Sequence, residues 1–175
     1  SLCGSEVDKP RYYRMIAGTC VSNLISDNVK QSNNRVICGD VLSGTKINRE
    51  GYLGFYDTQI TVIKEGDQEE FLGWILPGFD KFSLSKSYVS WLFPKRKYEI
   101  DTNMRGEERA YVVTGQYEEV LPMNIFPQQL IKAIMIEDID LMEKLGLYEL
   151  APEDMALCEF VCTSKIEVQS IIRHG

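Results

Sequence analysis

The sequence has almost no histidine and no apolar run long enough to span a bilayer. Its only histidine is His174, next to the last of 175 residues, so a His-based catalytic triad is excluded. The apolar stretches at residues 71–76 and 131–136 are far shorter than the roughly 18 apolar residues that a membrane-spanning helix requires. We therefore expect a chain that does not cross a membrane and has no His-dependent active site.

An excess of positive charge is also missing. The chain contains 19 Lys and Arg against 26 Asp and Glu, for a net charge of -7. Nonspecific binding to nucleic acid depends on clustered cations, and the one dense basic run, Lys95-Arg96-Lys97, is too short to reverse the acidic balance. We expect no nucleic-acid partner.

Cysteine is sparse and follows no repeating framework. The five cysteines, at positions 3, 20, 38, 158 and 162, are odd in number, which indicates free thiols in a reducing compartment such as the cytoplasm rather than secreted disulfides. The chain has no initiator Met and no signal peptide, so we interpret it as a part of a longer protein.

Two motifs partly resemble a metal site and a nucleotide-binding loop, but neither has the full pattern. Cys158 and Cys162 are about one helical turn apart and could share a metal, but no second Cys pair or His lies at zinc-like spacing nearby, so burial in a helical core is the simpler reading. In the run from Gly39 to Lys46, Thr precedes Lys, the reverse of a P-loop, and no helical pattern follows. We expect a glycine-bounded turn there.

Residues 1–70 show the pattern of a small sheet crossed by one helix. Runs rich in β-branched and aromatic residues predict strands at 12–17, 35–38 and 59–63. Apolar residues at helical spacing between positions 21 and 29 predict one short helix, with Ser22 as a possible N-cap.

Residues 71–109 contain both tryptophans and are predicted to form an extended hairpin or connector. Aromatics with polar neighbours are frequent at interfaces, where they bury a large area at low entropic cost, but they are also commonly part of a core. A core cap and a docking surface therefore both remain open for this segment. The candidate interface residues are Trp74, Phe79, Phe82, Trp91 and Phe93. The polar run at 101–109 marks a domain boundary.

Residues 110–175 read as a compact helical domain. Pro127 suits a first helical position, and Gly146 is a suitable stop after an apolar stripe. Pro152 opens a helix that carries both Cys158 and Cys162. The sequence from Ser164 to Glu167 has the form of a capping box at the start of a last helix containing Ile171 and Ile172.

Two stretches, residues 120–130 (VLPMNIFPQQL) and 157–166 (LCEFVCTSKI), resemble the NqrA family, the A subunits of the sodium-translocating NADH:quinone oxidoreductases. The resemblance extends through residues 36–44 and 51–57 and covers nearly the whole chain, which corresponds to the C-terminal part of the family's members. It implies an α+β chain: a β-grasp domain of the soluble-ligand-binding type, as in the flavoprotein subunit of complex I, followed by a small all-α domain.

More distantly, the helical part is similar to the C subunit of Rnf-type electron-transport complexes, which carries two C-x-x-C-x-x-C-x-x-x-C-P cluster motifs. An iron–sulfur cluster needs four thiolate ligands. The corresponding positions here are Tyr111, Thr114, Tyr117 and Leu121 in the first motif and Pro152, Met155, Cys158 and Cys162 in the second. With two thiols at eight positions, the resemblance implies a ferredoxin-like domain without a cluster, and we expect no bound metal.

The family resemblance also implies a function. The family's complex couples NADH oxidation and quinone reduction to Na⁺ export, and NqrA is its peripheral member on the cytoplasmic side of the bacterial inner membrane. Flavins and a 2Fe-2S cluster belong to other subunits. We therefore expect a non-catalytic docking part that contacts the membrane-embedded B subunit of the complex and carries no cofactor. The alternative is a module that binds quinone or another small soluble ligand.

Overall fold

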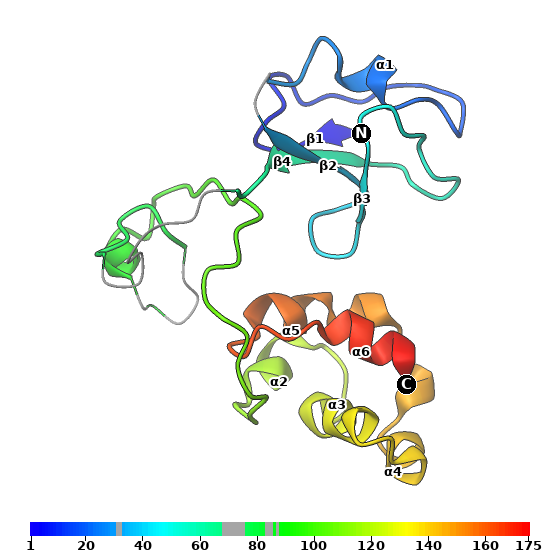
Figure 1. The fold of residues 1–175 in the computed structure, drawn as a ribbon, viewed down its shortest axis with the longest axis vertical. Coiled ribbons are helices and arrows are strands. Elements are labelled where there is room, and N and C mark those ends of the chain that lie inside the picture. Colours follow the sequence, from blue (N-terminus) through cyan, green and yellow to red (C-terminus); the bar gives the residue numbers. More distant parts are fainter. Residues whose placement is uncertain (31–32, 68–75, 83–85, 87) are drawn as a thin grey trace. The chain divides into compact units, whose positions relative to one another are not determined.

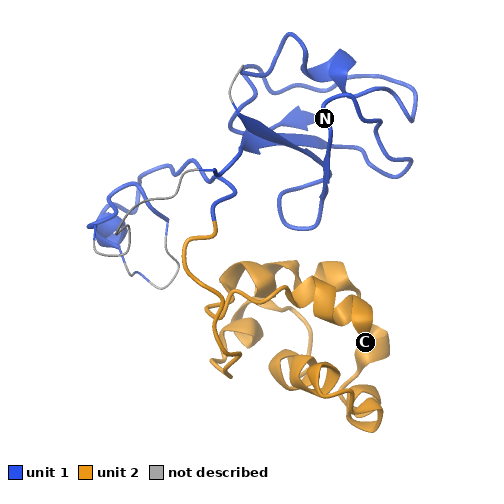
Figure 2. Cartoon of the chain, viewed as in Figure 1, with its two compact units in different colours: residues 1–103 blue, residues 104–175 orange. Residues whose placement is uncertain are grey.

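The computed structural model describes residues 1–30, 33–67, 76–82, 86 and 88–175. Two compact units divide the chain, residues 1–103 and residues 104–175 (Figure 2). The first unit contains a four-stranded sheet and one short α-helix, and the second contains five short α-helices. The combination of sheet and helices expected from the sequence is thus confirmed.

The sheet of the first unit is mixed and has the strand order β1-β4-β2-β3 (Figure 1). β4 pairs parallel with β1 and antiparallel with β2, which in turn pairs antiparallel with β3. The strand bounds are β1 Leu2–Cys3, β2 Asn34–Cys38, β3 Thr45–Ile47 and β4 Ile60–Lys64. The two strands predicted at 35–38 and 59–63 are confirmed as the central pair, and the short strands β1 and β3 flank them.

Apolar residues from the sheet and from helix α1, Ser22–Ile25, form the core of this unit. Val36 on β2 lies opposite Val62 on β4, and both are almost fully buried. The predicted helix is therefore present, but it is shorter than expected. Ser22 is its first residue and not its N-cap, because Val21 holds that position without a side-chain hydrogen bond.

The strand predicted at residues 12–17 is wrong. Only Arg11 bridges to Leu2, through a pair of backbone hydrogen bonds of 3.0 and 3.2 Å. Tyr12 and Ile16 are 90% and 85% exposed. A run of β-prone residues fits a pleated, half-buried surface, but it becomes a strand only where a partner edge continues alongside it. Here β1 ends after two residues, and the pairing stops with it.

Five short α-helices surround the core of the second unit (Figure 1). Their bounds are α2 Gln116–Val120, α3 Pro127–Met135, α4 Ile139–Lys144, α5 Ala156–Val161 and α6 Val168–His174. Pro127 does occupy the first turn of α3, and Gly146 follows α4 with a φ of +86°, so both predicted boundary signals are confirmed. None of the helices within the described ranges is long and apolar enough to cross a bilayer.

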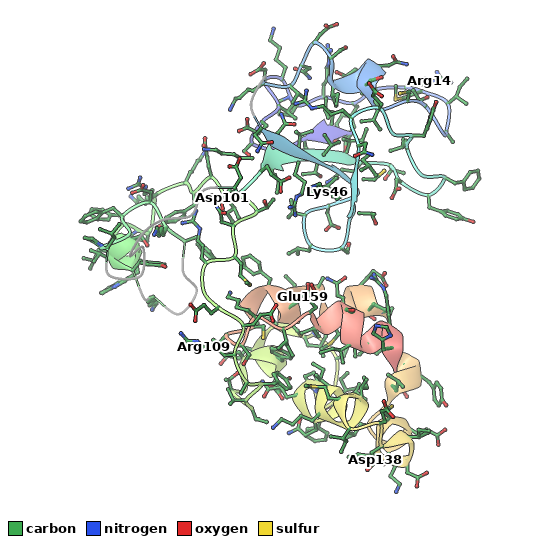
Figure 3. All side chains as sticks on the ribbon, viewed as in Figure 1. Arg14, Lys46, Asp101, Arg109, Asp138 and Glu159 are labelled. Carbon is green, nitrogen blue, oxygen red and sulfur yellow. The ribbon has the colours of Figure 1, made fainter. Side chains whose placement is uncertain are left out.

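The predicted capping box at Ser164 is wrong, although the helix after it exists. The Ser164 hydroxyl donates to the carbonyl of Ala110 at 3.1 Å, and α6 begins only at Val168. Glu159 on α5, labelled in Figure 3, supplies the cap instead, since its carboxylate accepts a hydrogen bond of 2.8 Å from the backbone N–H of Gln169. A carboxylate at a helix N-terminus also interacts favourably with the helix dipole.

Gly4, which follows β1, provides a test of how closely the backbone there approaches β4. Its φ is +123°, and a Cβ added there would overlap the carbonyl of Val62. We expect Gly4→Ala to lower the free energy of unfolding by about 3 kcal/mol, because it adds a clash to the backbone strain. In the control, Gly18→Ala, φ is +77° but the space is open, so only the strain of about 1 kcal/mol remains. Urea unfolding followed by circular dichroism measures the free energy of unfolding of both variants. An equal decrease in the two would contradict the close approach of Gly4 to the carbonyl of Val62.

Candidate functional site

The aromatic segment forms an arm of the first unit that leaves the sheet after β4. We call residues 76–98 the aromatic arm, of which 76–82, 86 and 88–98 are described. Next to its base, the hydroxyl oxygen of Thr102 accepts a hydrogen bond of 2.7 Å from the N–H of Gly66 and donates one of 3.2 Å to the carboxylate of Glu65. These bonds join positions 36 and 37 residues apart in sequence, so the segment that leaves β4 and the segment that returns are held together.

The carboxylate of Glu65 anchors this base to the sheet. It forms an ion pair with Arg35 on β2 and a second contact of 3.4 Å with Lys46 on β3, which is labelled in Figure 3. The hydrogen bonds from Arg35 lower the pKa of Glu65 to about 2. The carboxylate therefore stays ionised, and the ion pair persists, across the physiological pH range.

Inside the aromatic arm, a 3₁₀ turn at Val89–Leu92 is fastened by side-chain hydrogen bonds. The hydroxyl of the buried Ser90 donates to the carbonyl of Lys81 at 2.6 Å, and Tyr98 donates to the carbonyl of Ser90 at 3.1 Å. Phe82 packs edge-to-face on the ring of Tyr98, with the ring centres 5.8 Å apart. The two described sides of the arm are thus fastened to each other.

The aromatic arm presents an apolar hollow at its surface. The hollow has a volume of about 670 Å³. Its lining residues are Phe79, Leu92, Phe93, Pro94, Lys95 and Arg96. Phe79 and Phe93 are 48% and 51% exposed.

The five candidate interface residues have different outcomes. Phe79 and Phe93 come together at the hollow, and Trp91 lies beside it with 53% of its surface exposed. Phe82 is partly covered by Tyr98. Trp74 lies outside the described residues. Whether these aromatics form an interface stays a prediction, but the described ones do not form a buried core cap.

The other candidate positions, Cys158 and Cys162, are buried in the core of the helical unit at 0% and 1% exposure. The thiol of Cys158 lies 3.9 Å from the carbonyl of Tyr117, to which it donates. Burial raises the pKa of Cys158 to about 11, so the neutral thiol is strongly favoured at neutral pH. Metal binding and nucleophilic attack both require the thiolate. The environment of Cys158 is therefore that of a structural cysteine.

Six of the eight positions that correspond to cluster ligands carry no thiol. Tyr117, Leu121 and Met155 belong to the same buried core as the two cysteines, and Tyr111 packs against it. The rings of Tyr111 and Tyr117 are 6.0 Å apart, and burial raises the pKa of both hydroxyls. Among the described residues, no group of three or more His, Cys, Asp or Glu is placed to hold a metal ion. This donor set does not fit an iron–sulfur cluster.

The turn at residues 39–46 has no free cradle for a phosphate. The carboxylate of Asp40 accepts hydrogen bonds from the backbone N–H groups of Leu42 and Ser43 at 2.7 and 2.8 Å. These bonds lower the pKa of Asp40, with the bond from Ser43 making the largest contribution. The Asp40 carboxylate thus occupies the backbone N–H donors that a phosphate would need. The expected glycine-bounded turn, which connects β2 and β3, is confirmed.

Sequence reasoning missed the cationic edge of the hollow. Lys95 and Arg96 line it, and Lys97 follows with its side chain exposed. From sequence alone, the basic run 95–97 is considered only as a possible nucleic-acid site. The signal that could have identified it was its position, because only one proline separates it from the apolar run Trp91-Leu92-Phe93.

Comparison with known proteins connects these features to one family. Residues 1–49 match the family model described as the NQRA C-terminal domain. The chain is 46% identical over 177 residues to the A subunit of the Na(+)-translocating NADH-quinone reductase of Rhodopirellula baltica, a match that covers 100% of this chain and 39% of the relative. The same subunit of Pasteurella multocida is 43% identical (100% and 39% covered), and that of Shewanella frigidimarina is 40% identical (97% and 38% covered).

The chain is therefore homologous over its whole length to a part of these respiratory-complex subunits, and it spans about two fifths of their length. The family to which the resemblance pointed, NqrA of the Na(+)-translocating NADH-quinone reductases, is confirmed.

Thiol accessibility tests the burial of the cysteine pair. A disulfide reagent at about pH 8 should modify Cys3 and Cys20 rapidly in the native protein, because both are partly exposed. The buried Cys38, Cys158 and Cys162 should react only after unfolding. Mass spectrometry of the labelled peptides identifies each site, and a Cys158→Ala/Cys162→Ala variant should lose only slow-reacting thiols. Rapid labelling of Cys158 or Cys162 in the native protein would contradict their burial.

Proposed function

We propose that the chain is the C-terminal part of an NqrA protein in a complex that couples NADH oxidation and quinone reduction to Na⁺ export. Homology over the whole chain supports this assignment. In this proposal the protein is a peripheral member of the complex and lies on the cytoplasmic side of the bacterial inner membrane. The first unit is a β-grasp domain, and the second is a ferredoxin-like domain that has lost its clusters.

Within that complex, we propose a role in architecture rather than electron transfer. The supporting observation is the core of the helical unit, where Tyr117, Leu121 and Met155 fill positions at which cluster ligands would stand. The flavins and the 2Fe-2S cluster would belong to other subunits. No catalytic residue is assigned to this chain, and NADH and quinone are substrates of the whole complex.

The observation that carries a docking role is the exposed aromatic hollow of the arm. Trp, Tyr and Phe side chains dominate the energetics of protein interfaces, because they bury a large apolar area and lose few rotatable bonds. Phe79 and Phe93 present such an area on a segment fastened by its own hydrogen bonds. We propose that this hollow, together with Phe82 and the neighbouring Trp91 and Trp74, contacts the membrane-embedded B subunit of the complex.

Capture of the 175-residue chain by the detergent-solubilised B subunit tests this docking. We expect Phe79→Ala/Phe93→Ala to weaken the capture by about 10-fold or more, since both residues line the hollow. The matched control is Phe55→Ala/Tyr56→Ala, which removes a still more exposed aromatic pair outside the arm. Unchanged capture by the hollow variant, or an equal loss in the control, would refute docking through the hollow.

A second candidate function is binding of quinone or another small soluble ligand. The same hollow favours it, because an apolar recess lined by aromatic rings suits a flat ring ligand. The two candidates separate in the capture experiment. A water-soluble quinone analogue that occupies the hollow should displace the B subunit from it and change the fluorescence of the nearby Trp91 saturably, whereas a pure docking surface should respond in neither way.

A further inference from the structure

The aromatic arm differs in charge from the rest of the chain. Residues 76–98 contain five Lys or Arg and one Asp, whereas the remainder contains 14 Lys or Arg and 25 Asp or Glu. An acidic protein with one basic segment will orient that segment toward a negatively charged surface and keep its other faces away from it. The positive charge of the arm therefore favours one orientation of the chain, with the arm toward a negatively charged surface.

Seven consecutive residues of the arm, 91–97, are all exposed, and we call them the tip. Trp91, Leu92 and Phe93 are each more than half exposed. A backbone hydrogen bond of 3.0 Å from the N–H of Arg96 to the carbonyl of Phe93 closes a turn that brings the cations next to these apolar side chains.

The cations of the tip make few ion-pair contacts with the described part of the chain. Arg96 makes one exposed contact of 3.9 Å with Asp80, a geometry that contributes little stability. Neither Lys95 nor Lys97 has an ion-pair partner in the part of the chain that the structure describes. Both lysine charges are thus available to an external anionic surface.

We propose that the tip binds the headgroup region of a bilayer that contains anionic lipids. Trp and Phe favour the boundary between headgroups and acyl chains, and adjacent Lys and Arg side chains reach the lipid phosphates. Three cations in a row are too few to hold a nucleic-acid backbone against a net charge of -7. A bilayer surface, in contrast, matches both the apolar half and the basic half of the tip at once.

This inference refines the proposed function by adding a lipid contact to the same arm, and it rests on the proposed placement beside a membrane. The two contacts overlap at Phe93, Lys95 and Arg96, which line the hollow and belong to the tip, and at Trp91. Phe79 belongs only to the hollow and Lys97 only to the tip, because Phe79 lies outside residues 91–97 and Lys97 does not line the hollow. Vesicle binding requires no protein partner, so the lipid contact and the docking role can fail separately.

Flotation of the 175-residue chain with vesicles tests the lipid contact. Vesicles of phosphatidylglycerol and phosphatidylethanolamine should bind the chain, and phosphatidylcholine vesicles should bind it weakly. Raising the NaCl concentration from about 0.05 to about 0.5 M should reduce the binding, because salt screens surface charge. In a Trp74→Phe background, Trp91 is the remaining tryptophan, and its emission should shift to shorter wavelength on binding.

Matched variants identify the residues responsible. Lys95→Gln/Arg96→Gln/Lys97→Gln should weaken binding on the order of 100-fold, and Trp91→Ala should weaken it about 10-fold. The control, Lys9→Gln/Lys64→Gln/Lys144→Gln, removes the same charge from exposed positions outside the arm and should bind nearly normally.

The proposal would be overturned by no vesicle binding, by equal binding to neutral and anionic vesicles, or by equal losses of binding in the two charge variants. If the tip variants keep vesicle binding but lose capture by the B subunit in detergent, the tip is a protein contact and the lipid assignment is wrong.

Discussion

Burial of sulfur and aromatic side chains in one apolar core is the constraint on which the helical unit depends. Its α-helices have 5 to 9 residues, and isolated helices shorter than about 12 residues are marginal in water. Their stability must therefore come from packing around Tyr117, Met155 and Cys158. Fully burying one large apolar side chain contributes about 1.5–3 kcal/mol. The helical unit thus has a packed apolar interior.

The first unit has its own buried core, and the aromatic arm that belongs to it keeps large apolar side chains in contact with water. This is possible because Glu65 and Thr102 fasten the base of the aromatic arm, and Ser90 and Tyr98 fasten its interior. An arm held in this way loses little conformational entropy when its aromatics are covered by a partner.

The features that could be predicted from sequence are those determined by local chemistry. Pro127 and Gly146 marked the ends of helices, because each restricts the backbone wherever it occurs. The strand at 12–17 failed because it needed a partner edge, and Ser164 failed as a cap because Ala110, 54 residues away, takes its hydroxyl. The exposure of Phe79 and Phe93 depends on the same long-range folding, so sequence alone left core and interface open.

The claim that the helical unit is filled by side chains and not by clusters can be tested directly. The chain should be purified under strictly anaerobic conditions, and its visible absorption, iron and acid-labile sulfide measured on one sample. The account predicts a colourless protein with no bound iron or sulfide, since two of eight ligand positions hold thiols and both of these are buried. Stoichiometric iron and sulfide with a broad visible band would contradict it.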